Sequence, residues 1–256
     1  MNRSTPKARM DTILYLNEAD VRPLVTMGDI LNYCEEAYQI YGKYQKGKAQ
    51  GYFSSMSSFP TKTPHSDVDY RAGTIDPIPS ICTTLGWGFW DNPENYRLPS
   101  VWEVVSLNDI NTGKPLCLMH GYYLGGARTG AAGAICSKYL AKKNPKTLGL
   151  IGAGTVNMYM LSAHLELYKK FEKVSVWSRT SKRADAFAKE MSDKFETEVR
   201  SVGNLRHAVE GMDIVCVATP AREPIVMNDW VKQGTHINAF GADARGKQEL
   251  DPHILT

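Results

Sequence analysis

From residue 147 onward, the chain alternates between short apolar runs and longer segments with apolar residues along one helical side. Short continuous apolar runs are typical of buried strands, and apolar positions three or four residues apart are typical of helices. This alternation favours right-handed strand–helix–strand units and a parallel sheet covered on both faces. The predicted strands are residues 147–151, 173–177, 198–201, 213–218 and 235–240, and the predicted helical segments are residues 156–170, 182–194 and 205–209.

The pattern before residue 141 is more mixed. Ile30, Leu31 and Cys34 begin a series of apolar residues at helical spacing, which predicts a helix over residues 27–45. Residues 51–79 are rich in Ser, Thr, Pro and Gly, a composition that predicts long loops between short strands. The other predicted elements are a strand at residues 13–16, a hairpin of strands at 101–107 and 116–122, and a small-residue helix at 126–141.

A polar segment that contains Pro145 separates these two patterns. Such a segment is typical of a domain boundary. We therefore expect an α/β protein with two domains. An α+β domain would occupy residues 1–141, and a Rossmann-type domain with a parallel sheet would occupy residues 147–256.

Composition narrows the class of protein. The 256 residues are 43% apolar, which is enough for one sizeable core or two modest ones. A net charge of +3 with scattered basic residues argues against a nucleic-acid partner. No apolar run approaches the roughly 18 residues of a membrane helix, and the basic residues 1–10 precede no signal-peptide core.

The cysteines and histidines indicate neither disulfides nor a metal. Five scattered cysteines without a CxxC pair are typical of buried thiols in a reducing compartment. The six histidines have no metal-ligand spacing, and His236, inside a predicted strand, is interpreted as a core residue. We expect a soluble cytoplasmic protein without a metal.

A glycine-rich turn lies between the first strand and the first helix of the second domain. Gly152-Ala153-Gly154-Thr155-Val156 places two glycines where a dinucleotide fold binds its pyrophosphate. The first glycine permits the tight turn, the second permits close approach, and the helix N-terminus offers free N–H groups. Asn157 replaces the third small residue of the fingerprint, which costs close packing and offers a polar contact. The alternative is a purely structural turn.

The end of the second strand bears on the choice of dinucleotide. NAD sites usually place Asp or Glu there for the ribose hydroxyls. This chain has Ser178-Arg179-Thr180, which suits a 2′-phosphate, so we expect NADP(H) to be preferred and NAD(H) to remain possible. The alternative is a solvated loop with incidental cations. Ala218 and Thr219, at the end of the fourth strand, are expected beside the nicotinamide.

The chain resembles the ornithine cyclodeaminase/mu-crystallin family over nearly its whole length. The most specific stretch is Ala127-Arg128-Thr129-Gly130-Ala131-Ala132, followed by the glycine turn. The other matching segments are residues 14–21, 35–38, 92–99, 107–115, 213–219, 224–225 and 234–243.

The resemblance implies a fold and an activity. It implies that residues 1–141 form a substrate-binding and dimerisation domain, that residues 147–256 bind the dinucleotide, and that the protein is a homodimer. Family members use nicotinamide cofactors on the carbon–nitrogen bond of small amino or imino acids, as ketimine reductases, amino-acid dehydrogenases or cyclodeaminases. Mu-crystallin illustrates the alternative, an NADP(H)-regulated small-molecule-binding protein without turnover.

Two site residues carry over by resemblance. Arg128 matches the substrate-carboxylate arginine and is expected in the first turn of a helix, where the dipole also favours an anion. Asp243 matches the catalytic aspartate, and it follows a predicted strand at the carboxyl edge of the sheet. The alternatives are a surface ion pair for Arg128 and a turn residue for Asp243.

Three departures from the family concern the substrate side and the chain end. The family's active-site lysine aligns near Trp87, and no lysine occurs between Lys62 and Lys114. An earlier substrate arginine, expected at residues 50–55, is also missing, and Arg71 is the candidate to replace one of the two. These losses argue against ornithine cyclisation itself. Family members usually continue beyond the catalytic loop, which leaves open whether the chain is a fragment truncated at its C-terminus.

Overall fold

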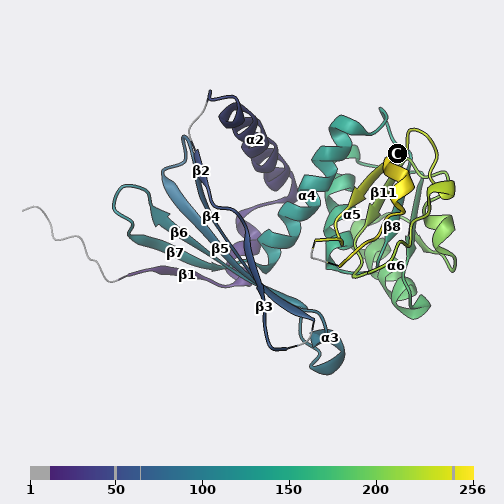
Figure 1. Ribbon diagram of the computed structural model, residues 1–256, viewed down its shortest axis with the longest axis horizontal. Coiled ribbons are helices and arrows are strands. Elements are labelled where there is room, and N and C mark those ends of the chain that lie inside the picture. Colours follow the sequence, from purple (N-terminus) through teal and green to yellow (C-terminus); the bar gives the residue numbers. More distant parts are fainter. Residues whose placement is uncertain (1–11, 49–50, 64, 244–245) are drawn as a thin grey trace, which may run out of the picture. The chain divides into compact units, whose positions relative to one another are not determined.

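The computed structural model describes residues 12–48, 51–63, 65–243 and 246–256, so the basic segment 1–10 lies outside the described residues. The chain forms two compact units (Figure 1). Unit 1 comprises residues 1–26 and 36–125, and unit 2 comprises residues 27–35 and 126–256. No helix of the described part combines the length and the apolar character that crossing a bilayer requires.

Unit 1 is built on a seven-stranded sheet. Its strand order is β1-β7-β6-β5-β4-β2, with β3 also paired to β4. All pairs are antiparallel except β1 with β7. The strands are β1 (Leu14–Leu16), β2 (Gly51–Phe53), β3 (Ser57–Pro60), β4 (Ser66–Ile75), β5 (Ser80–Phe89), β6 (Val101–Asp109) and β7 (Pro115–His120).

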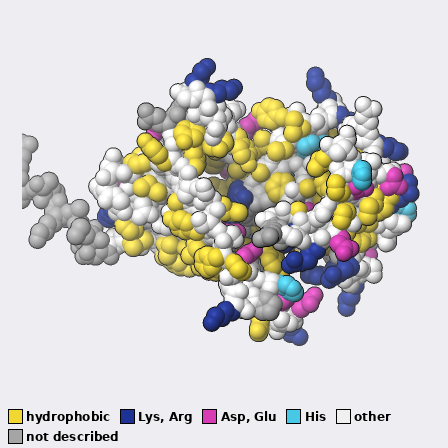
Figure 2. Space-filling view, in the orientation of Figure 1, with side chains coloured by type: hydrophobic (Ala, Val, Ile, Leu, Met, Phe, Trp, Pro, Cys, Tyr) yellow, Lys and Arg dark blue, Asp and Glu magenta, His cyan; other side chains and the backbone are white. Residues whose placement is uncertain are grey.

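One face of this sheet is covered and the other exposes apolar side chains. Val105 and Cys117 are buried on the covered face, where Tyr41 and Tyr44 of α2 (Met27–Gln45) contact the ring of Phe53. The space-filling view shows apolar side chains gathered over the strands of unit 1 (Figure 2). Strand pairing places Phe59, Tyr70, Trp102, Leu118 and Tyr15 on the opposite face, each at least 37% exposed.

Unit 2 is built on a five-stranded parallel sheet with the order β10-β9-β8-β11-β12. Leu148 and Leu150 of β8 pack with helices α5 and α6 in one buried cluster. Ile151 packs with Val215 and Leu205 in another. The strands are β8 (Thr147–Ile151), β9 (Lys173–Trp177), β10 (Val199–Ser201), β11 (Ile214–Val217) and β12 (His236–Ala239).

The remaining elements are short or helical. In unit 1 they are α1 (Glu18–Val21), η1 (Arg22–Leu24) and α3 (Asn92–Asn95). In unit 2 they are most of α4 (Tyr122–Leu140), α5 (Thr155–Tyr168), α6 (Ser181–Phe195), η2 (Leu205–Ala208), η3 (Asn228–Trp230) and η4 (Pro252–Leu255). The predicted Rossmann-type parallel sheet is therefore confirmed, with its strands close to the expected positions.

Close packing of α4 on α5 decides where the two units divide. A Cβ at Gly130 would lie 2.3 Å from the carbonyl oxygen of Tyr159, so only glycine lets the helices approach this closely. The hydroxyl of Ser137 on α4 also bonds His164 on α5, at 2.8 Å. The two units consequently divide between Gly125 and Gly126. The sequence pattern predicts a later boundary, at residues 142–146. The roles expected of the two domains stay predictions.

The expectation of long loops over residues 51–79 is wrong. The ten-residue strand β4 occupies most of the second half of this segment, and the ten-residue strand β5 follows it. In β4, Val68 and Tyr70 share one face while Asp67, Asp69 and Arg71 share the other, which is the two-residue alternation of a strand. Some of the polar residues that indicate loops, Asp67, Asp69 and Arg71 among them, lie on the second face of this strand.

Candidate active site

The glycine turn has the geometry that a dinucleotide needs. Gly152 directly follows β8 with φ of +104°, and a Cβ there would lie 2.4 Å from the carbonyl oxygen of Ala218. Only glycine meets both conditions. The space in front of Gly154 is open, and a Cβ at this residue would meet no heavy atom within 4 Å. Gly154 caps α5 without a side-chain bond, so the first N–H groups of this helix can bind an anion.

Asn157 stabilises this turn from inside. Its side chain is fully buried, and its amide nitrogen donates to the carbonyl oxygens of Ile151 at 2.8 Å and Gly152 at 2.7 Å. The polar contact expected of Asn157 is therefore present. Ala153 and Val156 are partly buried and pack against the core. Thr155 is exposed at the start of α5, so these three residues offer mainly backbone N–H groups to a ligand.

The turn between β9 and α6 presents a positive charge. Arg179 and Thr180 are exposed and Ser178 is half-buried. Thr180 is the N-cap of α6 but makes no side-chain capping bond, which leaves the N–H groups of the first helical turn without a side-chain partner. The described residues of this turn include no carboxylate. The arrangement fits a phosphate group.

The ends of β11 and β12 lie at the same edge of the sheet as the glycine turn. Ala218 donates its N–H to the carbonyl of Ile151, at 2.9 Å. Thr219 donates its N–H and its hydroxyl to the carboxylate of Glu249, at 2.6 and 2.7 Å. Sequence reasoning missed Glu249, because a glutamate thirty positions away carries no local signal of such contact.

Asp243 follows β12 in an exposed position. Its side chain is 56% exposed, and Oδ1 lies 2.6 Å from the Nζ of Lys247, whose own side chain is 10% exposed. The carboxylate is thus accessible and already paired with a cation. Sequence reasoning missed Lys247, although its spacing of four residues from Asp243 was the available signal.

Arg128 lies on the exposed side of α4. The helix begins at Tyr122, so Arg128 is in its second turn, and the expectation of a first-turn arginine is wrong. The helix dipole therefore does not add to anion binding at this side chain. Burial raises the pKa of the neighbouring Cys34 thiol, and the positive charge of Arg128 acts in the opposite direction. Arg128 remains an exposed guanidinium suited to a carboxylate.

Arg71 belongs to unit 1, on β4. Its guanidinium lies 3.7 Å from the carboxylate of Asp69 on the same face of the strand. Its Nε is buried and donates to no group of the described residues. Trp87, at the position expected for the family lysine, lies on the neighbouring strand β5.

A buried chain of polar groups connects α4, α5 and β12. Nδ1 of His164 lies 2.7 Å from the carbonyl oxygen of Met160, so Nδ1 carries the proton and Nε2 accepts from the Ser137 hydroxyl. Asn238 donates to Ser137 at 2.9 Å and accepts from His236 at 3.2 Å. Burial lowers the pKa of His164 to about 4, so the ring is neutral at pH 7. His236 is only half-buried, but its hydrogen bond agrees with a structural role.

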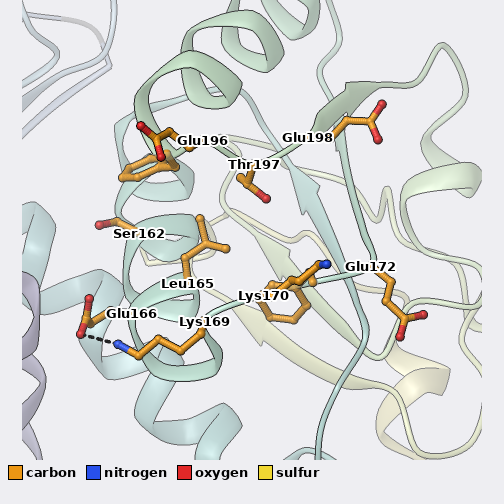
Figure 3. Close-up of a pocket in the computed structure, with 11 residues that line it drawn as sticks. Ser162, Leu165, Glu166, Lys169, Lys170, Glu172, Glu196, Thr197 and Glu198 are labelled. Carbon is orange, nitrogen blue, oxygen red and sulfur yellow. Dashed lines mark hydrogen bonds and ion pairs between the residues drawn. The ribbon is translucent and has the colours of Figure 1, made fainter.

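A separate hollow of about 910 Å³ lies at the other edge of the parallel sheet (Figure 3). It is bordered by the second half of α5, the segment that leads from α5 to β9, and the segment between α6 and β10. Nζ of Lys169 lies 2.8 Å from Oε1 of Glu166, and the two residues form an ion pair. Ligands of open α/β sheets bind at the carboxyl ends of the strands, so this hollow lies away from the candidate site. Within the described ranges, no group of three His, Cys, Asp or Glu residues could hold a metal.

The model of the ornithine cyclodeaminase/mu-crystallin family matches residues 13–256. The chain belongs to this family. An alanine dehydrogenase from Archaeoglobus fulgidus is 33% identical over 251 residues, which cover 96% of this chain and 72% of that protein. The resemblance inferred from the sequence is therefore confirmed.

Two solved structures share the fold and a substantial part of the sequence. The Δ1-pyrroline-2-carboxylate reductase of Thermococcus litoralis, in complex with NADH and L-proline, has a TM-score of 0.88. It is 33% identical, with 95% of this chain and 73% of that one covered. An archaeal alanine dehydrogenase dimer with bound NAD has a TM-score of 0.84 and 32% identity, with 95% and 72% covered. These relatives agree with the expected class, a nicotinamide-dependent enzyme acting on amino or imino acids.

Proposed function

We propose that this family member transfers a hydride between a nicotinamide cofactor and the α-carbon of a small amino or imino acid. The observation that carries the proposal is the shared position of the groups required. The open glycine turn after β8, Thr219 after β11 and the exposed carboxylate of Asp243 after β12 all belong to the carboxyl edge of one parallel sheet. Ligands of such sheets bind at this edge.

The turns after β8 and β9 fit a dinucleotide. Gly152, Gly154 and the first N–H groups of α5 would hold the pyrophosphate, and Ala218 and Thr219 would border the nicotinamide. When bound, the nicotinamide supplies or accepts the hydride. Arg179, with the adjacent hydroxyls, supports a preference for a 2′-phosphate and therefore for NADP(H). The two solved relatives hold NADH and NAD, and the support for NADP(H) comes from the residues of this chain's own turn.

The substrate roles follow from the charges. Arg128 would bind the substrate carboxylate through a two-pronged, charge-assisted contact, with Arg71 as the other candidate. Asp243 would hold the substrate amine and accept or return its proton, and Lys247 keeps the carboxylate oriented. Reduction of an imino acid consumes the cofactor, whereas a cyclodeaminase recycles it. The missing lysine near Trp87 favours reduction or dehydrogenation over ornithine cyclisation.

The alternative function is a nucleotide-regulated binding protein without turnover. The absence of any lysine between Lys62 and Lys114 favours it, because that stretch lacks the family's ammonium group. The accessible carboxylate of Asp243 favours the enzyme, since a binding protein has no need of a proton acceptor there. We therefore place the enzyme first.

We also propose that the protein is a homodimer formed through the exposed face of the unit 1 sheet. Tyr70, Trp102 and Leu118 are exposed together on this face. Ordinary surfaces expose apolar residues singly, whereas a group of them marks an interaction site. A hollow of about 850 Å³ on this face is lined by Trp87 and Trp102, among others, and could receive side chains of a second copy.

The five cysteines are free thiols, which supports a reducing compartment such as the cytoplasm.

Steady-state assays distinguish the enzyme from the binding protein. The full chain is mixed with NADPH or NADH and a panel of cyclic and linear imino acids, and the loss of reduced nicotinamide absorbance is followed. Proline formation from ornithine with catalytic cofactor is measured in parallel. The enzyme gives turnover with at least one imino acid, and Asp243→Asn lowers the rate constant by about 10²- to 10⁴-fold while nucleotide affinity is kept. Nucleotide binding without turnover on any substrate would support the binding protein.

A further inference from the structure

Glu249 is a buried carboxylate with an unusual set of partners. The residue is 1% exposed, and its two oxygens accept hydrogen bonds from two different strand ends. Oε1 accepts from the N–H of Thr219 at 2.6 Å and from its hydroxyl at 2.7 Å. Oε2 accepts from the N–H of Gly241 at 2.7 Å. Within the described residues these donors are two amides and one hydroxyl, with no lysine or arginine among them.

The two strand ends carry different parts of the proposed site. Thr219 follows β11, on the side where the nicotinamide is expected. Gly241 follows β12 and begins the loop that reaches Asp243. Phe240, between β12 and Gly241, still bonds the carbonyl of Val217, at 2.8 Å. Beyond this bond, the carboxylate of Glu249 bonds both chain segments, one at Thr219 and the other at Gly241.

Close approach makes this junction intolerant of a larger residue. A Cβ at Gly241 would lie 2.1 Å from the carbonyl oxygen of Thr219 and 2.4 Å from Oε1 of Glu249. Real Cβ atoms do not approach other atoms so closely, so glycine is required for the contact. The sequence thus provides both the acceptor and the space for it.

The backbone of Glu249 is fixed separately. Its carbonyl oxygen accepts from the N–H groups of Ile225 at 2.9 Å and Val226 at 3.0 Å, and Leu250 forms a parallel bridge with Val226. Val226 is itself fully buried against the sheet. The side chain therefore extends from an anchored segment toward the two strand ends.

We propose that Glu249 is a positioning residue that fixes the end of β11 to the end of β12. It sets the distance between the nicotinamide side of the site and the catalytic loop, and it acts on the reaction through Thr219 and Gly241 without touching the substrate. The kinetic part of this inference rests on the proposed function. The structural part stands on the contacts of Glu249 alone.

Replacement of the carboxylate by an amide tests this role. Both oxygens of Glu249 accept from N–H donors, but glutamine has only one oxygen, and its NH₂ group would face a donor. The amide oxygen would keep Thr219, which provides two donors, and the NH₂ would be turned toward the N–H of Gly241. Glu249→Gln should therefore release the loop that carries Asp243 while it leaves the Thr219 side in place.

The experiment compares the full-length parent, Glu249→Gln and the matched control Glu190→Gln, whose glutamate is exposed on α6. Amide hydrogen exchange is measured by NMR at Gly241 and Thr219, alongside kcat, KM and nucleotide Kd. In Glu249→Gln, amide exchange at Gly241 should accelerate by about tenfold or more, and kcat should fall by about tenfold. Amide exchange at Thr219 and the nucleotide Kd should stay within about threefold of the parent values. Glu190→Gln should match the parent.

Unchanged exchange at Gly241 in Glu249→Gln overturns the proposal, and so does an unchanged kcat after the protection is lost. The parent alone gives a second measurement that does not depend on the variant's folding. A Gly241 amide that exchanges at the free-peptide rate in the parent shows that the contact with Glu249 does not persist in solution. If the parent turns over no imino acid, the proposed function fails, while exchange at Gly241 still decides whether Glu249 joins the strand ends.

Discussion

The side-chain amide of Asn157 donates a hydrogen bond to the carbonyl of Gly152, the first glycine of the turn between β8 and α5. Its Nδ2 lies 2.7 Å from the carbonyl oxygen of Gly152 and 2.8 Å from that of Ile151, and the side chain is fully buried. Asparagine thus replaces the usual small residue with a contact that fixes the turn. The shape of the turn depends on a hydrogen-bond donor at this position.

Asn157→Asp should weaken nucleotide binding. A carboxylate cannot donate to the two carbonyls, and it would place a buried negative charge beside their oxygens. Loss of two buried hydrogen bonds predicts a decrease of about 2 to 3 kcal/mol in the free energy of unfolding, with a nucleotide Kd raised by about tenfold or more. Urea unfolding and nucleotide titration check this. An Asn157→Asp variant that binds nucleotide as the parent does would show that the turn holds its shape without the amide.

Arg179→Asp should erase or invert the preference for NADP(H). The exposed guanidinium stands at the end of β9, where a carboxylate would bind the ribose hydroxyls of NAD. Exchange of the charge-assisted phosphate contact for repulsion predicts a change of about 100-fold in the ratio of the two Kd values. Lys189→Asp, on the exposed side of α6, is the matched control and should leave the ratio unchanged. Equal affinity of the parent for both cofactors would contradict the preference.

The helix α6 and the strands β8 and β9 show what the sequence could predict. Their apolar residues form continuous buried runs or a clear helical stripe, and the predicted bounds of β8 and β9 agree with those found. A parallel sheet buried on both faces produces such runs directly. The family motifs indicated the position of the loop that carries Asp243, which composition alone did not indicate.

Strand β5 and helix α4 show why other parts could not be predicted. β5 contains Gly86 and Gly88, and glycine in a sequence indicates a turn more often than a strand. In the fold, Gly88 is needed for close packing, because a Cβ there would lie only 2.8 Å from the ring of Trp90. Helix α4 begins with Tyr122 and Tyr123, whose aromatic side chains are typical of strands. The sequence therefore predicts a helix that begins only at residue 126, with Arg128 in its first turn. The partners of Glu249 are distant in sequence, and only the fold brings them together.

The buried imidazole of His164 predicts a loss of stability in acid. Burial lowers its pKa to about 4 from an ordinary value of 6.5, and the nearby His236 acts in the same direction. Above pH 6.5 the ring is neutral in both the folded and the unfolded chain, so its contribution is fully present. Between pH 6.5 and about 4 the unfolded chain binds a proton that the folded chain does not, and stability falls as the pH falls.

Urea unfolding of the parent and of His164→Gln over this pH range measures the effect. Between pH 7 and pH 4 the parent should lose about 3 kcal/mol more of its free energy of unfolding than the variant does. The comparison uses the slope against pH, because the substitution also changes the bond to Ser137. Parallel profiles for the two proteins would show that the ring titrates alike in both states.

Arg128→Ala should raise the KM for a carboxylate substrate and leave cofactor affinity unchanged. Removal of a charge-assisted, two-pronged contact should cost about 2 to 4 kcal/mol of binding free energy, which corresponds to a KM raised by about 30- to 1,000-fold. Steady-state kinetics with the imino acid varied at saturating cofactor measure it. An unchanged KM would assign the carboxylate to another cation, such as Arg71.

The transfer of a labelled hydride tests the proposed activity most directly. The full-length protein is incubated with NADPH or NADH that carries deuterium at both C4 positions of the nicotinamide and with a cyclic imino acid, and the product is examined by mass spectrometry and NMR. We predict one deuterium on the α-carbon of the amino acid for each oxidised cofactor, with the rate of its formation lowered by about 10²- to 10⁴-fold in Asp243→Asn. Tight binding of the cofactor without any deuterium in an amino acid, across cyclic and linear imino acids, would contradict it.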